Sequence, residues 1–443
     1  MTTHPAHPPA AKLARTVGFW GAVWMGLGSI IGTGVFVSLG IAAGVAGSSV
    51  VLAVALAALV ATANGLSSAQ LAAAHPVSGG TYEYGHRLLG PTAGYAAGWM
   101  FLSAKSASAA TAALGFAGYL LHVLGAPDDQ WTRVAVALAL VALLTGLVSR
   151  GIQRSNAANI AIVSLTLLAL AAFVAFGIAC APPELLNERL GFDALTQALS
   201  EPASLLNATA LMFVAYTGYG RIATLGEEVK EPSRTIPRAI IGTLALSMLL
   251  YISVSATAVA VVGADAFARA TSAVAAPLEV VAQRFDHPQI AGLVALGAVT
   301  AMAGVLLNLL LGLSRVLLAM ARRREMPAAL DHVDPRTSSP NRAVWVIGAL
   351  IAALVLVGDV KTTWSFSAFT VLIYYGITNL AALRLAPEHQ RFPRAISALG
   401  LVACFGLAFF VQWQIWIAGL GLLALGFLIR ALVARAAQGR FDR

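Results

Sequence analysis

The stretch Gly28-Ser-Ile-Ile-Gly-Thr-Gly34 interrupts the first long apolar run of the chain, and Ala215-Tyr-Thr-Gly-Tyr-Gly220 interrupts the sixth. In lipid, each unpaired backbone group costs several kcal/mol, so an unwound stretch persists only where protein, water or a ligand satisfies it. Glycine lowers the conformational cost and lets a ligand approach the backbone. The two interruptions therefore predict two broken membrane helices that face each other across a binding site.

Composition sets the solvent in which the chain folds. Of 443 residues, 59% are hydrophobic and 11% charged, whereas a soluble domain has roughly 45–50% apolar and ~25% charged residues. One crossing needs about 20 apolar residues, so we predict an all-α polytopic membrane protein with twelve transmembrane helices. The apolar runs lie near 17–43, 47–73, 91–121, 131–149, 155–180, 205–224, 237–263, 288–320, 343–359, 362–386, 394–412 and 414–434.

The net charge of +9 reflects membrane topology rather than nucleic-acid binding. If both termini are cytoplasmic, the cytoplasmic loops and helix ends hold 22 of the 28 Lys and Arg residues and the opposite side holds five. Such a bias is the usual determinant of orientation. Lys105 alone lies within a span. No stripe of basic and aromatic residues lies outside the bilayer, so we expect no nucleic-acid partner.

Other classes of function find little support. Cys180 and Cys404 fall in or near predicted spans and indicate neither a disulfide framework nor a metal site. His122, Glu279 and the scattered serines form no nucleophile–base or metal-ligand spacing, so we expect no enzyme and no cofactor. A channel would need a continuous polar pore or a repeated selectivity sequence. The interruptions occur only once in each half of the core, which favours a transporter.

The spans group into two blocks of five followed by two more. We expect a cytoplasmic tail at 1–16, a transporter core at 17–386 with repeats at 17–180 and 205–386, and helices 11 and 12 with a cytoplasmic C-terminus at 387–443. Because each block has an odd number of crossings, the second must be inverted relative to the first. Inverted repeats of this kind place a substrate near the bilayer midplane between discontinuous helices.

The two breaks suit a zwitterion. Freed N–H groups and the positive end of a helix at Gly32-Thr33-Gly34 favour a carboxylate, and carbonyls exposed between Ala215 and Gly220 would accept hydrogen bonds from an ammonium group. An α-amino acid carries both charges close together. A second interpretation also stays open, in which Gly28 and Gly32 only permit close helix packing.

Several motifs, in order along nearly the whole chain, resemble those of the amino acid-polyamine-organocation transporters, and within them bacterial amino acid permeases. They are Gly28-Ser-Ile-Ile-Gly-Thr-Gly-Val-Phe-Val37; Gln70-Leu-Ala-Ala-Ala-His-Pro76 with Gly79-Gly-Thr-Tyr-Glu-Tyr84 and Gly94-Tyr-Ala-Ala-Gly-Trp99; Phe213 through Tyr219 to Glu227-Glu228-Val-Lys230, Pro232, Arg234 and Pro237; Ser314-Arg315, Ala319-Met-Ala-Arg322 and Pro335-Arg336-Thr337 with Pro340; and Tyr374-Tyr375-Gly-Ile-Thr-Asn379 with Leu383-Arg384.

The resemblance implies a secondary active transporter that works by alternating access in a bacterial-type inner membrane, with both termini cytoplasmic and membrane lipid around it. It places the substrate carboxylate at the amides around Gly32 and Gly34, with the Thr33 hydroxyl as an added donor. It places the amino group at carbonyls near the end of each half-helix, and Tyr219 would close over the substrate. The implied substrate-binding residues are Ser29, Ile30, Gly32, Thr33, Gly34, Ala215, Tyr216, Thr217, Gly218 and Tyr219.

Departures from the family pattern indicate the substrate. Members that carry cationic amino acids usually have an acid in the third span and another after the break in span six. The matching positions here are Ala104 or Lys105 and Gly220 or Arg221. A cationic side chain would meet no compensating carboxylate in a medium of low dielectric constant. We therefore expect a neutral L-amino acid, with an anionic amino acid as the alternative.

The coupling ion stays open between several candidates. An ionisable residue inside a span is a functional candidate by default, so Lys105 is the candidate for proton coupling; a lysine that merely faces an aqueous vestibule is the alternative. Some proton-coupled relatives carry a lysine in span five, but residues 159–166 contain none. Sodium would need oxygen ligands from the first break and from span eight, where Thr300 is followed by Ala301. We therefore rank sodium below H⁺ or exchange.

The segment after the second break supplies candidates for gating. Arg221, Glu227 and Glu228 follow the interruption, and we expect the two acids to pair with cytoplasmic Arg315 or Arg322. The Arg322-Arg323-Arg324 run is interpreted as topology charge in contact with lipid headgroups.

Overall fold

The computed structural model describes residues 15, 17–76, 79–127, 129–151, 156–181, 184, 189, 191, 196, 198–223, 228–334, 336–337 and 339–438. Within these residues every regular element is a helix, which confirms the all-α class; one isolated β-bridge joins Val17 and Val229. The expected tail at 1–16 lies, except for Arg15 at its end, outside the described residues.

The helices follow one another along the chain with short connections. In the first half they are α1 (Phe19–Ile30), η1 (Gly34–Ser38), α2 (Leu39–Ala46), η2 (Gly47–Ser49), α3 (Val50–Ala74), α4 (Thr81–Leu89), α5 (Pro91–Val123), α6 (Gln130–Ser149) and α7 (Asn156–Cys180). In the second half they are α10 (Pro202–Tyr216), η3 (Thr217–Tyr219), α11 (Gly220–Ala223), α12 (Pro232–Val262), α13 (Ala264–Val274), α14 (Pro277–Ala282), α15 (Pro288–Arg322), η4 (Ala328–Asp331), α16 (Asn341–Val355), α17 (Val360–Leu383), η5 (Pro387–His389), α18 (Arg394–Ala408) and α19 (Trp413–Gln438).

Eight helical stretches of the described chain are long and apolar enough to cross a membrane. The first of them, Phe19–Ala74, runs through both α1 and α3. The shorter apolar helices α16 and α18 fall below this length. The fold is therefore that of a polytopic membrane protein, while the count of twelve crossings and the inversion of the repeats stay predictions.

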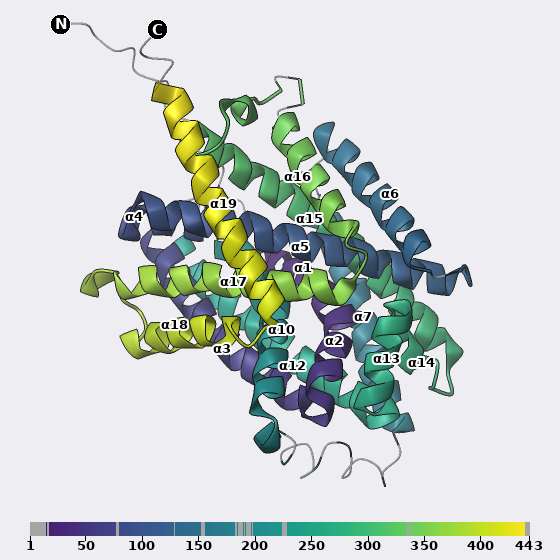
Figure 1. Cartoon of the computed structure of the whole chain (residues 1–443). Coiled ribbons are helices and arrows are strands. Elements are labelled where there is room, and N and C mark those ends of the chain that lie inside the picture. Colours follow the sequence, from purple (N-terminus) through teal and green to yellow (C-terminus); the bar gives the residue numbers. More distant parts are fainter. Residues whose placement is uncertain are drawn as a thin grey trace, which may run out of the picture.

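The centre of the bundle is made of α5 and α17, which pack against each other and cross the middle of Figure 1. About 78% of the most apolar part of each is buried, against 11% for α19, which lies diagonally across the front of the view. Small side chains on α5, such as Ala104, Ala107 and Ser108, let neighbouring helices approach closely. The interrupted helices α1 and α10 therefore lie among well-packed elements.

Aspartate caps fix the starts of α6 and α17. The Asp129 carboxylate accepts hydrogen bonds from the amides of Trp131 and Thr132 at 3.0 and 3.1 Å. Asp359 does the same for Lys361 and Thr362 at 3.3 and 2.7 Å. Such caps satisfy amides that have no partner within the helix, and they hold these helix ends in register.

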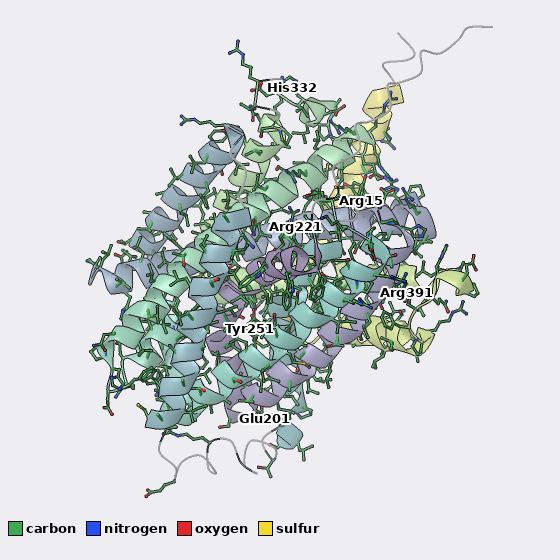
Figure 2. The ribbon with its side chains drawn as sticks, turned by 180° about the vertical axis from the view of Figure 1, so that it is seen from behind. Arg15, Glu201, Arg221, Tyr251, His332 and Arg391 are labelled. Carbon is green, nitrogen blue, oxygen red and sulfur yellow. The ribbon has the colours of Figure 1, made fainter. Side chains whose placement is uncertain are left out.

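Charged residues lie at the two ends of the molecule. Figure 2 shows Arg15, His332 and Arg391 along the upper and right-hand side and Glu201 at the bottom. Arg15 precedes α1, His332 follows α15 and Arg391 precedes α18, so they belong to connections expected to be cytoplasmic. Which side of the membrane this end faces stays a prediction.

Candidate functional site

The first helix is interrupted where the sequence predicts. Helix α1 ends at Ile30, and Ile31 is extended with φ −80° and ψ 108°. The chain turns back into a helix at once, because the amides of Val35 and Phe36 both donate to the Gly32 carbonyl at 3.1 and 3.2 Å. The first amides of a new helix have no partner inside that helix. The amides from Gly32 to Gly34 thus lie at a helix N-terminus.

The second interruption is tighter than predicted. Helix α10 ends at Tyr216, and the chain continues through the 3-10 turn η3 directly into α11. The carbonyls of this turn have protein partners: the Tyr375 hydroxyl donates to the Thr217 carbonyl at 3.0 Å, and the Thr217 hydroxyl donates to the Val214 carbonyl at 2.7 Å. The expected unwound stretch is therefore a narrowed helical turn, held by α17.

The two interruptions touch each other through glycine. A Cβ on Gly218 would lie 2.2 Å from the Ser29 carbonyl oxygen and 2.5 Å from the Ile30 amide nitrogen. A Cβ on Gly34 would lie 2.7 Å from the Cβ of Ala215. No side chain fits at either position, so glycine is what allows the breaks to meet. Their facing across one site, predicted from the sequence, is the arrangement seen.

Tyr251 of α12 connects the two breaks and was not singled out by the sequence analysis. Its hydroxyl donates to the Ile30 carbonyl at 2.8 Å and lies 3.4 Å from the Ala215 carbonyl. The side chain is fully buried, its ring is 5.0 Å from that of Tyr216, and Figure 2 places it in the middle of the bundle. The only sequence signal is a lone phenol in the apolar run 248–254.

Lys105 reaches the second break from α5. Its ammonium group donates to the Thr217 hydroxyl at 2.8 Å. The same hydroxyl donates to the Val214 carbonyl, so a chain of two hydrogen bonds runs from the lysine into the end of α10. The residue therefore contacts the candidate site itself, in an environment without a carboxylate partner among its printed contacts.

Aromatic rings line the far side of the second break. Tyr219 is fully buried, with its ring 5.5 Å from that of Tyr375. Phe213 lies edge-on to Tyr375 at 5.6 Å. This packing makes the surroundings of η3 apolar and aromatic, which suits an uncharged side chain.

The side chains of the first break divide into two kinds. Thr33 is buried, and its hydroxyl has no hydrogen-bond partner within the described structure. Ser29, in contrast, donates its hydroxyl to the Met25 carbonyl of its own helix at 3.0 Å. A buried hydroxyl without a partner is uncommon, so Thr33 is a free donor for a ligand and Ser29 offers only its backbone.

Gly28 and Gly32 also serve helix packing. A Cβ on Gly28 would lie 2.2 Å from the Asn159 side-chain oxygen, and one on Gly32 would lie 2.6 Å from Val305. The Asn159 amide group donates to the Trp24 carbonyl at 2.9 Å, which ties α7 to α1. The packing interpretation of these two glycines therefore holds alongside the binding one.

The sodium alternative keeps a limited geometric basis. The Thr300 hydroxyl donates to the Leu296 carbonyl of its own helix at 2.8 Å. The Ala301 carbonyl lies 3.9 Å from where a Cβ on Gly32 would stand, so α15 and the first break do run side by side. No group of three or more His, Cys, Asp or Glu residues comes together in the described part of the chain.

The gating candidates adopt a different arrangement from the predicted one. Arg322 pairs with Asp331 at 3.2 Å, in place of the expected glutamate. The Glu228 carbonyl instead accepts a hydrogen bond from the Val17 amide at 3.0 Å, and the Lys230 amide donates to the Val17 carbonyl at 2.8 Å. Glu227 lies outside the described residues. Arg221 lies near the centre of Figure 2, within electrostatic reach of Arg315 and Glu228.

A buried glutamate organises one end of the molecule, and sequence reasoning missed it. Glu325 accepts hydrogen bonds from the Tyr82 hydroxyl at 2.7 Å and contacts His86 at 3.2 Å. Its other oxygen lies 3.2 Å from the Arg430 guanidinium of α19. Burial and the bond to Glu325 raise the pKa of Tyr82 above its usual value. The cluster fastens α4, α15 and α19 to one another.

A second cluster lies beside α14. The Tyr119 hydroxyl donates to the Phe36 carbonyl at 2.8 Å and accepts from the Leu278 amide at 3.3 Å, which ties η1 to α14. The neighbouring Glu279 is buried, 3.8 Å from His122, and one of its oxygens has no partner within the described structure. Burial raises the pKa of Glu279 to about 7.

Two interrupted apolar helices that meet in the middle of an all-helical membrane bundle define a transporter of the discontinuous-helix class. The chain belongs to the amino acid permease family, whose sequence model matches residues 21–442. Membership of this family confirms the transporter assignment and rules for a permease rather than an enzyme.

Similar proteins carry related descriptions. An uncharacterized transporter of Mycobacterium tuberculosis (strain H37Rv) is 41% identical over 434 residues, which cover 96% of this chain and 94% of that protein. A branched-chain amino acid permease of Bacillus subtilis is 27% identical over 453 residues, covering 96% and 94%. A methylthioribose transporter of the same organism is 26% identical over 458 residues, covering 98% and 96%. The chain is thus an amino acid transporter by family.

Proposed function

We propose that this protein is a secondary active transporter that moves neutral L-amino acids across a bacterial-type inner membrane by alternating access, in exchange or with H⁺. The observation that carries the proposal is the contact between the two breaks at Gly34 and Gly218. It brings a helix N-terminus and a helix C-terminus to the same point, and a zwitterion has one charge for each.

The carboxylate is assigned to the first break. The amides of Gly32, Thr33 and Gly34 open the second part of the first helix, where the helix dipole favours negative charge. The buried Thr33 hydroxyl has no other partner within the described residues and adds a side-chain donor. A carboxylate at this place would satisfy groups that the protein itself leaves unpaired.

The amino group is assigned to the carbonyls of Ile30 and Ala215. A single hydroxyl, that of Tyr251, lies within 2.8 Å of the first carbonyl and 3.4 Å of the second. One ammonium group can therefore contact both carbonyls at once. This pair is narrower than the predicted set, since the Thr217 carbonyl is already used by Tyr375.

The side chain is assigned to the aromatic surroundings of η3. Phe213, Tyr219 and Tyr375 supply apolar contact, and Lys105 is the cation beside them. This environment disfavours arginine and lysine. The branched-chain permease of Bacillus subtilis supports a neutral apolar substrate. An acidic side chain that pairs with Lys105 is the alternative.

Lys105 is the proposed coupling residue. Its ammonium group holds the Thr217 hydroxyl, and through it the end of α10, so gain or loss of a proton at Lys105 would act directly on the second break. Sodium is the alternative coupling ion, with carbonyls of the first break and of α15 as the donors. Twelve crossings, two inverted five-helix repeats and cytoplasmic termini complete the proposed architecture.

Uptake into liposomes that contain the purified protein tests the proposal. Labelled leucine, glutamate, arginine and methylthioribose are compared, each with a pH gradient, a sodium gradient or neither. We expect saturable, stereospecific uptake of leucine that responds to the pH gradient or to amino acid preloaded inside. Preference for glutamate, dependence on sodium, or accumulation of methylthioribose alone would each replace the corresponding part. Unsaturable flux without stereospecificity would indicate a channel.

A further inference from the structure

Tyr251 holds the place that the proposed function gives to the substrate's amino group. Its hydroxyl is the donor at 2.8 Å to the Ile30 carbonyl and lies 3.4 Å from the Ala215 carbonyl. These carbonyls come from different broken helices, and the hydroxyl spans the gap between them. A Cβ on Gly34, in the proposed carboxylate subsite, would lie 3.4 Å from this same oxygen.

The placement is not a general consequence of burying a tyrosine. Tyr216 is also buried in this cluster, yet its hydroxyl donates to the Val54 carbonyl of α3 at 3.3 Å. Tyr119 is a third buried phenol, and it reaches the first broken helix at Phe36, past the break. Among the described residues Tyr251 is the side chain whose printed hydrogen bonds join both breaks.

We propose that Tyr251 is a resident occupant of the amine subsite, which the substrate's ammonium group must displace. The inference deepens the proposed function and rests on it. A hydrogen bond from a charged donor is roughly twice as strong as one from a neutral hydroxyl. An ammonium group therefore displaces the phenol, and a ligand without an amino group leaves it where it is.

Displacement has two consequences for transport. Before a substrate arrives, the phenol keeps two buried carbonyls paired and holds the broken helices together, which avoids the cost of unsatisfied groups. When a substrate binds, the amino group gains only its excess over the phenol. Tyr251 thus lowers the affinity for amino acids, eases their release, and makes opening of the contact depend on an amine.

Tyr251→Phe removes the donor and keeps the ring against Tyr216. The carbonyls of Ile30 and Ala215 then lack their partner until a substrate supplies one. One net hydrogen bond is worth about 0.5–1.5 kcal/mol, so leucine should bind about 2–10-fold more tightly. 4-Methylpentanoate, which is leucine without its amino group, should bind with unchanged affinity. The matched control is Tyr119→Phe, which removes a buried hydroxyl from the same broken helix but away from the breaks.

The experiment measures equilibrium binding of leucine and 4-methylpentanoate to both variants, together with amide hydrogen exchange of the substrate-free proteins. We expect faster exchange in 28–36 and 213–220 for Tyr251→Phe alone. Weaker leucine binding in Tyr251→Phe would overturn the proposal, since it would make Tyr251 a substrate ligand. An equal change for both ligands, or unchanged exchange, would also overturn it. If the wild type binds no amino acid, the proposed function fails, whereas the exchange result still decides whether Tyr251 joins the breaks.

Discussion

Gly218→Ala is the sharpest test of the contact between the two breaks. The added methyl carbon would lie 2.2 Å from the Ser29 carbonyl oxygen, whereas ordinary contact begins near 3.4 Å. The two segments must therefore separate by about 1.2 Å, and the atoms in the way belong to backbone, which cannot turn aside. Overpacking of this kind costs about 1–3 kcal/mol.

The cost falls on the arrangement in which the breaks touch. If binding requires that arrangement, a penalty of this size weakens the affinity for amino acids by about 5–150-fold. Titration of the purified variant with leucine gives the affinity, and thermal unfolding in the same detergent gives the stability. Gly312→Ala on α15 is the control, because a Cβ at Gly312 meets nothing within 4 Å. We expect the control to bind leucine as the wild type does.

An unchanged affinity for leucine in Gly218→Ala would refute the reasoning. It would mean that the breaks need not touch for binding, and that the two subsites do not form one site. A loss of stability with unchanged affinity would lead to the same conclusion, because the contact would then serve packing alone.

Three further predictions concern charged groups. Lys105→Gln keeps a donor for Thr217 but no charge, so uptake in liposomes should continue and lose its response to a pH gradient; a retained response would exclude Lys105 from coupling. Burial raises the pKa of Glu279 from 4.5 to about 7; because the folded state disfavours the carboxylate, unfolding free energy should fall as pH rises through this range, and Glu279→Gln should flatten the slope in denaturant titrations. Glu325→Gln leaves the Arg430 guanidinium without its counter-charge and should lower stability by about 3 kcal/mol; thermal unfolding identical to that of the wild type would show that the cluster does not secure α19.

The sequence predicted the breaks because glycine in an apolar run has few explanations. Gly32 and Gly34 mark the interruption of the first helix to within two residues of Ile31, where the backbone becomes extended. Contact between the breaks also followed from the sequence, since two gaps in lipid must satisfy each other. The family motifs then placed the chain in the family that the comparison confirms.

Long-range pairing could not be predicted in the same way. Glu325 is 243 positions away from its partner Tyr82, and neither residue has a local pattern that names the other. Tyr251 looks like one more aromatic residue in an apolar run, and only the fold shows that its hydroxyl meets two carbonyls. The narrow turn at Thr217 depends likewise on Tyr375, which lies in a distant helix.

The β-bridge between Val17 and Val229 makes one mechanical part of two distant pieces of chain. The strand-like residues before α1 and after α11 are fastened by backbone hydrogen bonds of 3.0 and 2.8 Å at Val17. A pull on either piece is thus transmitted to the other without any side chain. Fusion proteins that enter the chain just before Phe19 would load this joint, so a reporter of motion is better attached beyond α19.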